Sequence, residues 1–126
     1  MNLKLNHTIV FVRDKDESAK YWTDIFGLSP AVPFGPFLGV QVNDVTFDLD
    51  EVDDPSPGHY AFLVGEAEFD EIFGRIKQRD LPYWADPFGR VRGEINHHDG
   101  GRGVYFKDPS GHLLEILTRP YGSGRG

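Results

Sequence analysis

Apolar residues recur along the chain at two periods, and these periods predict two similar sets of elements. In the first set, apolar residues spaced three and four apart predict a helix over about residues 16–26. Asp16 or Ser18 is expected to cap its start, and Gly27 suits its end. The flanking apolar runs predict strands at about residues 5–12, 31–34, 37–42 and 45–50.

The same order follows a polar, proline-rich segment at residues 51–58, which is the best linker candidate in the chain. A strand is expected at about residues 59–64. A helix is expected at about residues 66–79, where apolar residues recur at i, i+3, i+4 and i+7. Further strands are expected at about residues 82–85, 103–107 and 113–118.

The order strand-helix-strand-strand-strand therefore occurs twice, which predicts an internal duplication. We expect one α+β domain over residues 1–126, made of two βαβββ modules at about residues 3–53 and 58–119. A chain of this length can bury a core of its own.

Composition narrows the classes of function. The chain has 39% apolar residues and 26% charged residues, which is typical of a globular protein. Its net charge of −7 argues against nucleic acid as a partner, because phosphate binding needs a basic face. It has no cysteine, so thiolate ligands and disulfides are excluded. No apolar run suits a signal peptide or a membrane span, and a cytoplasmic location without membrane contact is the expectation.

Three polar residues lie inside apolar runs that read as strands. They are His7, His59 and Glu115. An imidazole or a carboxylate in a buried strand is costly unless something pairs with it. Two histidines and one glutamate also form the ligand set of a mononuclear metal site with open positions.

The chain resembles the vicinal oxygen chelate superfamily, the group of the glyoxalases, bleomycin-resistance proteins and extradiol dioxygenases. The residues that carry the resemblance are Leu5-Asn6-His7 and the segments 21–28, 58–62 and 104–115. The last is the most specific, because it contains the pattern Tyr-Phe-x-Asp-Pro-x-Gly-x-x-x-Glu. The resemblance implies two βαβββ modules that form a curved mixed sheet around a metal-binding cleft.

By this resemblance, His7, His59 and Glu115 hold a divalent metal ion. The ligand types suit Fe(II), Mn(II), Ni(II) or Zn(II), and the sequence does not choose among them. Some members of the family have a fourth ligand, a glutamate on the last strand of the first module. Asp48 is the nearest match here, and its side chain is one methylene shorter. Asp48 is therefore expected as a fourth ligand, directly or through water, or as a catalytic base.

Residues of both halves offer contacts for a substrate. Arg102 could bind an anionic group, and four aromatic residues could line an apolar pocket. These are Phe34, Phe37, Trp84 and Tyr105. The connection from Trp84 to Arg102 is long enough to be functional or mobile. It carries His97 and His98, for which an exposed loop pair is favoured over a substrate contact. His112 is expected to be structural, with its side chain opposite to that of Glu115, and the tail 121–126 is expected to fray.

These observations favour a metal-dependent enzyme that acts on a small oxygenated substrate, with glyoxalase- or lyase-like chemistry or with dioxygenase-like chemistry. The ion would stabilise the oxyanion that develops in the reaction. The alternative is a metal-free, antibiotic-sequestering protein of the bleomycin-resistance kind. A homodimer is expected by resemblance, and also because strand edges would otherwise be exposed.

Overall fold

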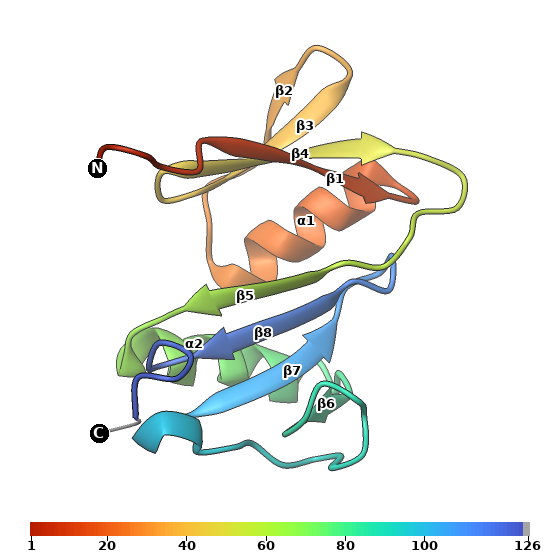
Figure 1. Cartoon of the computed structure of the whole chain (residues 1–126). Helices are drawn as coiled ribbons and strands as arrows, with labels where there is room; N and C mark the ends of the chain where they lie inside the picture. Colours follow the sequence, from red (N-terminus) through yellow and green to blue (C-terminus); the bar gives the residue numbers. More distant parts are fainter. Residues whose placement is uncertain (125–126) are drawn as a thin grey trace. The chain divides into compact units, whose positions relative to one another are not determined.

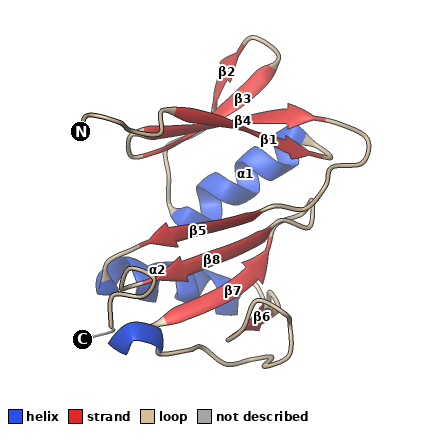
Figure 2. Cartoon of the chain, viewed as in Figure 1, coloured by secondary structure: helices blue, strands red, loops and turns tan. Residues whose placement is uncertain are grey.

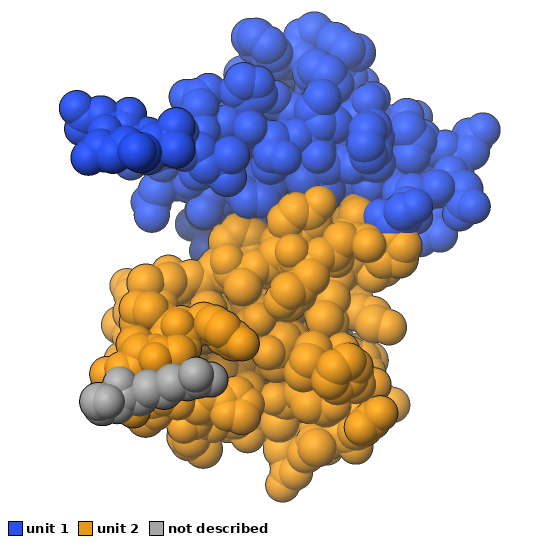
Figure 3. Space-filling view, in the orientation of Figure 1, with its two compact units in different colours: residues 1–56 blue, residues 57–126 orange. Residues whose placement is uncertain are grey.

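A computed structural model describes residues 1–124 of the chain, which divides into two compact units, Met1–Ser56 and Pro57–Gly126. Figure 3 colours the two units separately. Each unit contains one α-helix packed on a four-stranded mixed sheet (Figures 1 and 2). The α+β class and the repeated βαβββ order are therefore confirmed. Each module has its own sheet. Within residues 1–124, no helix has the length and apolar character required to cross a membrane.

Unit 1 contains the first five elements. They are β1 (His7–Val12), α1 (Lys15–Phe26), β2 (Val32–Phe34), β3 (Phe37–Val42) and β4 (Val45–Glu51). The sheet order is β1-β4-β3-β2, in which β1 and β4 are parallel and the other pairs are antiparallel. Parallel pairing of β1 with β4 places His7 beside Thr46 and Ile9 beside Asp48.

Helix α1 is capped two residues before the first of its expected caps, Asp16. Asp14 is the cap, because its carboxylate accepts a hydrogen bond from the backbone N–H of Glu17. The expectation that Asp16 or Ser18 would cap the helix was wrong, since both lie inside it. Gly27 ends the helix in the left-handed conformation, with φ of 70°. The buried face of the helix presents Trp22 to the sheet, where its ring lies 5.4 Å from that of Phe47.

Unit 2 contains the remaining elements. They are β5 (His59–Leu63), α2 (Glu66–Gln78), β6 (Tyr83–Trp84), a 3₁₀ turn η1 (His98–Gly100), β7 (Gly103–Lys107) and β8 (Leu113–Leu117). The sheet order is β5-β8-β7-β6, and β5 pairs with β8 in parallel. This is the order seen in unit 1, with β8 in the place of β4.

The core of unit 2 determines which side chains remain for chemistry. Alternate residues of β8 are buried together with apolar residues of β7 and α2. The set between the sheet and the helix consists of Phe69, Ile72, Ile76, Val104, Phe106, Leu114 and Ile116, and Tyr105 is also buried, at 8% exposure. Because strand side chains alternate, His59, Tyr105 and Glu115 lie on the opposite face of the sheet. The candidate ligands of this unit therefore share one face.

The long connection between β6 and β7 is held in place by its own hydrogen bonds. The Asp86 carboxylate accepts from the backbone N–H groups of Phe88, Arg90 and Val91. Desolvation acts to raise the pKa of Asp86, but these backbone donors outweigh it and the pKa is lowered. An isolated bridge joins Trp84 to Arg92 at the start of the connection.

Candidate metal centre and substrate pocket

His59 and Glu115 form the assembled part of the expected ligand set. Glu115 lies on β8 opposite Ala61 of β5, so its side chain is diagonal to that of His59 on the same face. The Nε2 atom of His59 lies 3.1 Å from Oε1 of Glu115. The side chain of His59 is 46% exposed and that of Glu115 is 13% exposed. The pair is therefore open to a ligand from the imidazole side.

The backbone of β8 orients the His59 ring. Its Nδ1 lies 3.2 Å from the carbonyl oxygen of Leu113, to which an Nδ1–H group donates. Glu115 can only accept, so without an ion Nε2–H donates to its carboxylate; an ion between the two side chains would replace that proton and use the Nε2 lone pair. Metal-bound histidines commonly have such an acceptor on the other ring nitrogen. The acceptor is a main-chain atom, so residue types alone did not reveal it.

His112 holds the start of the strand that carries His59. Its side chain is buried, and its Nδ1 accepts a hydrogen bond of 2.7 Å from the backbone N–H of Gly58. The carbonyl of Gly58 in turn accepts from the N–H of Leu113. The expectation of a structural His112 is confirmed by this burial and bonding. Its partner is the residue immediately before His59.

Tyr105 completes the floor beside the pair. Its ring stacks on that of His59 at 5.9 Å between centroids, and it lies opposite Glu115 in the register of β7 and β8. Burial, followed by the charge of Glu115 and a hydrogen bond to it, raises the pKa of Tyr105 to about 12. The hydroxyl therefore stays protonated at neutral pH and can donate to the carboxylate.

In unit 1, His7 and Asp48 line a second pocket, of about 420 Å³. The amide oxygen of Asn6 lies 2.8 Å from Nδ1 of His7, which again leaves Nε2 for an ion. Asp48 is 7% exposed, and its carboxylate forms no hydrogen bond or ion pair with any other residue of the described part of the chain. Its oxygens are not among the fully buried atoms of the described chain that lack a partner, and Asp48 lines the pocket, so a cation or a donor supplied by a ligand can reach the carboxylate.

Two other expected substrate contacts, Phe37 and Trp84, and the loop residue His97 have separate surroundings. Phe37 starts β3 in unit 1 and is half-buried. Trp84 lies on β6, with the ammonium of Lys107 5.8 Å from its ring. His97 is exposed, and its Nδ1 lies 3.2 Å from the carbonyl oxygen of Gly101. None of these three residues is among the residues that line the pocket beside Glu115.

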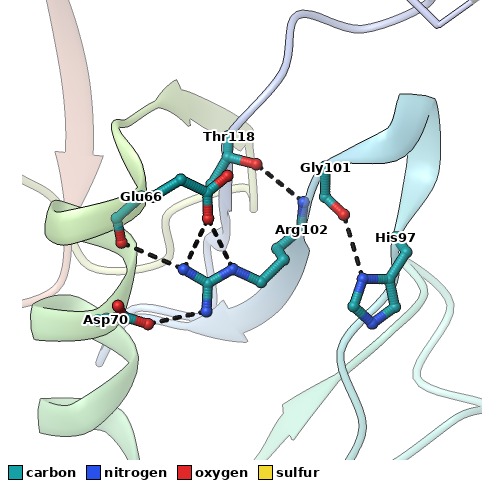
Figure 4. A network of polar contacts seen from close by, with 6 residues as sticks. All are labelled: Glu66, Asp70, His97, Gly101, Arg102 and Thr118. Carbon is teal, nitrogen blue, oxygen red and sulfur yellow. Dashed lines mark hydrogen bonds and ion pairs between the residues drawn. The ribbon is translucent and has the colours of Figure 1, made fainter.

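Arg102 is already engaged by two carboxylates of α2, as Figure 4 shows. Its guanidinium lies 2.7 Å from Oε1 of Glu66 and 2.8 Å from Oδ1 of Asp70, and it covers the ring of Phe69 at 4.3 Å. Hydrogen bonding to Asp70, and then to Glu66, raises the pKa of Arg102. Much of its charge is therefore balanced within unit 2.

A pocket of about 330 Å³ lies beside Glu115 in unit 2. Its lining residues come from β7, β8, the η1 turn and the tail. They are Asn96, His98, Asp99, Arg102, Tyr105, Glu115, Leu117, Arg119, Tyr121 and Gly122. Sequence reasoning identified Arg102, Tyr105 and Glu115 of this set. The tail residues were missed, because the segment after Tyr121 was expected to fray.

The donor atoms present suit a divalent ion. Two atoms that bind one ion at about 2.1 Å, at angles between octahedral and tetrahedral, lie about 3.0–3.4 Å apart. The 3.1 Å between His59 and Glu115 falls in this range. Within residues 1–124, the structure groups no three His, Cys, Asp or Glu side chains as a metal-binding cluster. The third expected ligand, His7, is part of unit 1.

The comparison with known families identifies the class. Residues 4–116 match the Glyoxalase/Bleomycin resistance protein/Dioxygenase superfamily, and the chain belongs to it. Two solved structures are similar to the chain over nearly its whole length, with more than half of the residues identical. Oxidase ChaP-H1 is 61% identical, with a TM-score of 0.92 and coverage of 95% of this chain and 98% of the other. Oxidase ChaP-H2 is 57% identical, with a TM-score of 0.93 and coverage of 98% and 99%.

Curated relatives are more distant. Glutathione transferase FosA of Serratia marcescens is 28% identical over 120 residues, which are 89% of this chain and 78% of the relative. Metallothiol transferase FosB of Lysinibacillus sphaericus (strain C3-41) is 29% identical over 121 residues, which are 90% and 81%. The recognised superfamily is thus confirmed. Its members with similar sequences carry the names of oxidases and of thiol transferases.

Proposed function

We propose that this chain is a metal-dependent oxidase that acts on a small oxygenated substrate, with molecular oxygen as the electron acceptor. The observation that carries the proposal is the 61% identity to Oxidase ChaP-H1 over 95% of the chain. The His59–Glu115 pair supports it, because the pair has the spacing of two ligands of one ion. Among the chemistries considered from the sequence, the proposal favours the dioxygenase-like one.

His7, His59 and Glu115 would hold the ion, which is Fe(II), Mn(II), Ni(II) or Zn(II) by ligand type. When bound, the ion supplies Lewis acidity and an open position for substrate oxygens. Two features of this chain prepare the ligands. The Leu113 carbonyl fixes the tautomer of His59, and Asn6 does the same for His7. Tyr105 limits rotation of the His59 ring by stacking on it.

Asp48 is the proposed base. A buried carboxylate without a protein donor can take the proton of a substrate hydroxyl, because no competing hydrogen bond has to break first. It shares a pocket with His7, so a substrate that approaches His7 also approaches Asp48. A role as a fourth ligand is the other use of the same carboxylate.

Substrate contacts are proposed at Phe37, Trp84, Tyr105 and Arg102. Tyr105 has the strongest support, because it lines the pocket beside Glu115. A homodimer and a small-molecule substrate belong to the same proposal.

The experiment is oxygen consumption by protein loaded with each of the four ions. Catechols and 2-hydroxycarboxylates serve as substrates because each presents adjacent oxygens. We expect substrate-dependent oxygen uptake that is lost in Glu115→Gln. A reaction under ¹⁸O₂ then shows whether the oxygen atoms enter the product or are released as peroxide. Conjugation of glutathione to fosfomycin, without oxygen uptake, would instead identify a thiol transferase like the curated relatives. Tight binding of an antibiotic without turnover or metal would identify the sequestering protein.

A further inference from the structure

The pocket beside Glu115 has a built outer wall, formed by the tail of the chain. The carboxylate of Asp99 accepts hydrogen bonds of 3.0 Å from the backbone N–H groups of both Gly122 and Gly124. Asp99 itself has a left-handed backbone, with φ of 58°. The expectation that the tail frays was therefore wrong for residues 121–124, and residues 125–126 lie outside the described part. Tyr121 and Gly122 of the tail line the pocket.

The floor and the wall of the pocket differ in chemistry. Tyr105, Glu115 and Leu117 come from the sheet face that also carries His59. His98 and Arg119 come from the η1 turn and from the segment after β8, which together are called the rim here. A volume of about 330 Å³ is at the lower end of the range for small-molecule sites. A ligand in this pocket would have both Glu115 and Arg119 among its lining residues.

Arg119 is a cation with an available guanidinium at that rim. No hydrogen bond or ion pair joins its side chain to any residue from 1 to 124. This differs from Arg102, whose guanidinium is bound by Glu66 and Asp70. The Asp99 carboxylate accepts from two tail N–H groups. Arg119 is consequently the cationic group in the pocket that lacks a protein partner in the described chain.

Arg119 is exposed, and the stem of its side chain lies close to the Gly100–Gly101 backbone. A Cβ atom on Gly101 would lie 2.8 Å from Cγ of Arg119, and one on Gly100 would lie 3.6 Å from its Nη1. The stem of the arginine thus approaches Gly101 more closely than a Cβ atom there would allow, while the 3.6 Å at Gly100 is an ordinary contact. The exposed guanidinium beyond the stem is accessible to an anion.

We propose that this pocket selects substrates that carry a carboxylate, and that Arg119 binds this group in a bidentate manner. The proposal rests on the proposed function, because it assigns the substrate class of the same site. A planar carboxylate matches the guanidinium fork. The adjacent oxygens of the substrate then lie toward Glu115, which lines the same pocket. Arg119 is a specificity-determining residue in this arrangement.

The test compares two probes that differ by one carboxylate. Both 3,4-dihydroxybenzoate and catechol have adjacent hydroxyls, and only the first has the carboxylate. Their dissociation constants are measured by calorimetry on metal-loaded wild-type protein, on Arg119→Gln and on the matched control Arg90→Gln. Arg90 is an exposed arginine that covers the ring of Phe88 and does not line this pocket.

We expect the wild type and Arg90→Gln to bind 3,4-dihydroxybenzoate at least about tenfold more tightly than catechol, the effect of one charge-assisted interaction. Arg119→Gln should bind the two probes equally, with its affinity for catechol unchanged. An equal affinity of the wild type for both probes, a preference that persists in Arg119→Gln, or no binding of 3,4-dihydroxybenzoate at millimolar concentration would overturn the proposal.

The same series separates this proposal from the proposed function. If catechol binds only to metal-loaded protein and 3,4-dihydroxybenzoate binds no more tightly than catechol, the result supports the metal site and excludes the role of Arg119. A preference for the carboxylate that is unaffected by the metal supports Arg119 and counts against the metal site.

Discussion

Replacement of His112 tests whether the turn before β8 prepares a metal ligand or only stabilises the fold. The side chain is 1% exposed, and its Nδ1 accepts from the N–H of Gly58, the residue before His59. His112→Leu keeps much of the volume and removes the acceptor. His112→Asn is the matched control, because its amide oxygen can occupy the position of Nδ1 and accept the same hydrogen bond.

The size of the effect follows from the lost acceptor. An unsatisfied backbone N–H costs about 1–3 kcal/mol when buried, and Gly58 is half-buried, so His112→Leu should lose about 1 kcal/mol of unfolding free energy. Loss of the edge-on contact with the ring of Tyr60, at 5.6 Å, adds to this. Because His59 then loses its fixed strand start, metal affinity should fall by about 10-fold or more.

Two measurements distinguish the roles. Urea unfolding of metal-free protein gives the stability, and calorimetric titration with the metal gives the affinity. We expect His112→Asn to recover most of the metal affinity lost in His112→Leu. The reasoning is refuted if His112→Leu is destabilised yet binds metal like the wild type, or if His112→Asn is no better than His112→Leu in both measurements.

Two other contacts give further predictions. Arg102→Lys should lower the free energy of unfolding by about 0.5–1 kcal/mol, because a lysine cannot pair with Glu66 and Asp70 together. Urea unfolding at low salt and in 1 M salt measures this loss, which should be smaller in 1 M salt. An equal loss at the two salt concentrations would contradict the prediction. Asp86→Asn should destabilise the protein at pH 7. The carboxylate has a lowered pKa, so its contribution is present above its ordinary value of 3.8 and is lost as the pH falls through the folded value. The difference between wild type and variant in urea midpoint should therefore narrow below pH 3.8, and a constant difference from pH 7 to pH 2 would count against it.

Much of the fold could be predicted from the sequence because its signals are local. The strands at 37–42 and 103–107 were predicted with their observed bounds, and Gly27 ends α1 as expected. The cap of α1 was not predicted, because Asp14, Asp16 and Ser18 lie close together and are all residue types that cap helices. The choice among them depends on where the chain leaves β1.

The candidate site was predictable only in part, for a similar reason. Residue types and family resemblance point to His59 and Glu115, which the structure brings to 3.1 Å. The groups that orient or surround them depend on contacts between distant segments. The Leu113 carbonyl is a main-chain group, so no residue type identifies it. Arg119 can be recognised as a pocket residue only when the hydrogen bonds between the tail and Asp99 are known. A tail of glycine and serine gives no periodicity from which this could be inferred.

The central claim is that His7, His59 and Glu115 hold one divalent ion. The most direct measurement is the metal content of untagged protein after loading with Fe(II), Mn(II), Ni(II) or Zn(II) and exhaustive dialysis, alongside His59→Ala and Glu115→Gln. We expect about one ion per chain in the wild type for at least one metal, and loss of that ion in both variants with little change in urea stability of the metal-free protein. A wild type that retains none of the four ions, or variants that retain the ion with wild-type affinity, would contradict the account.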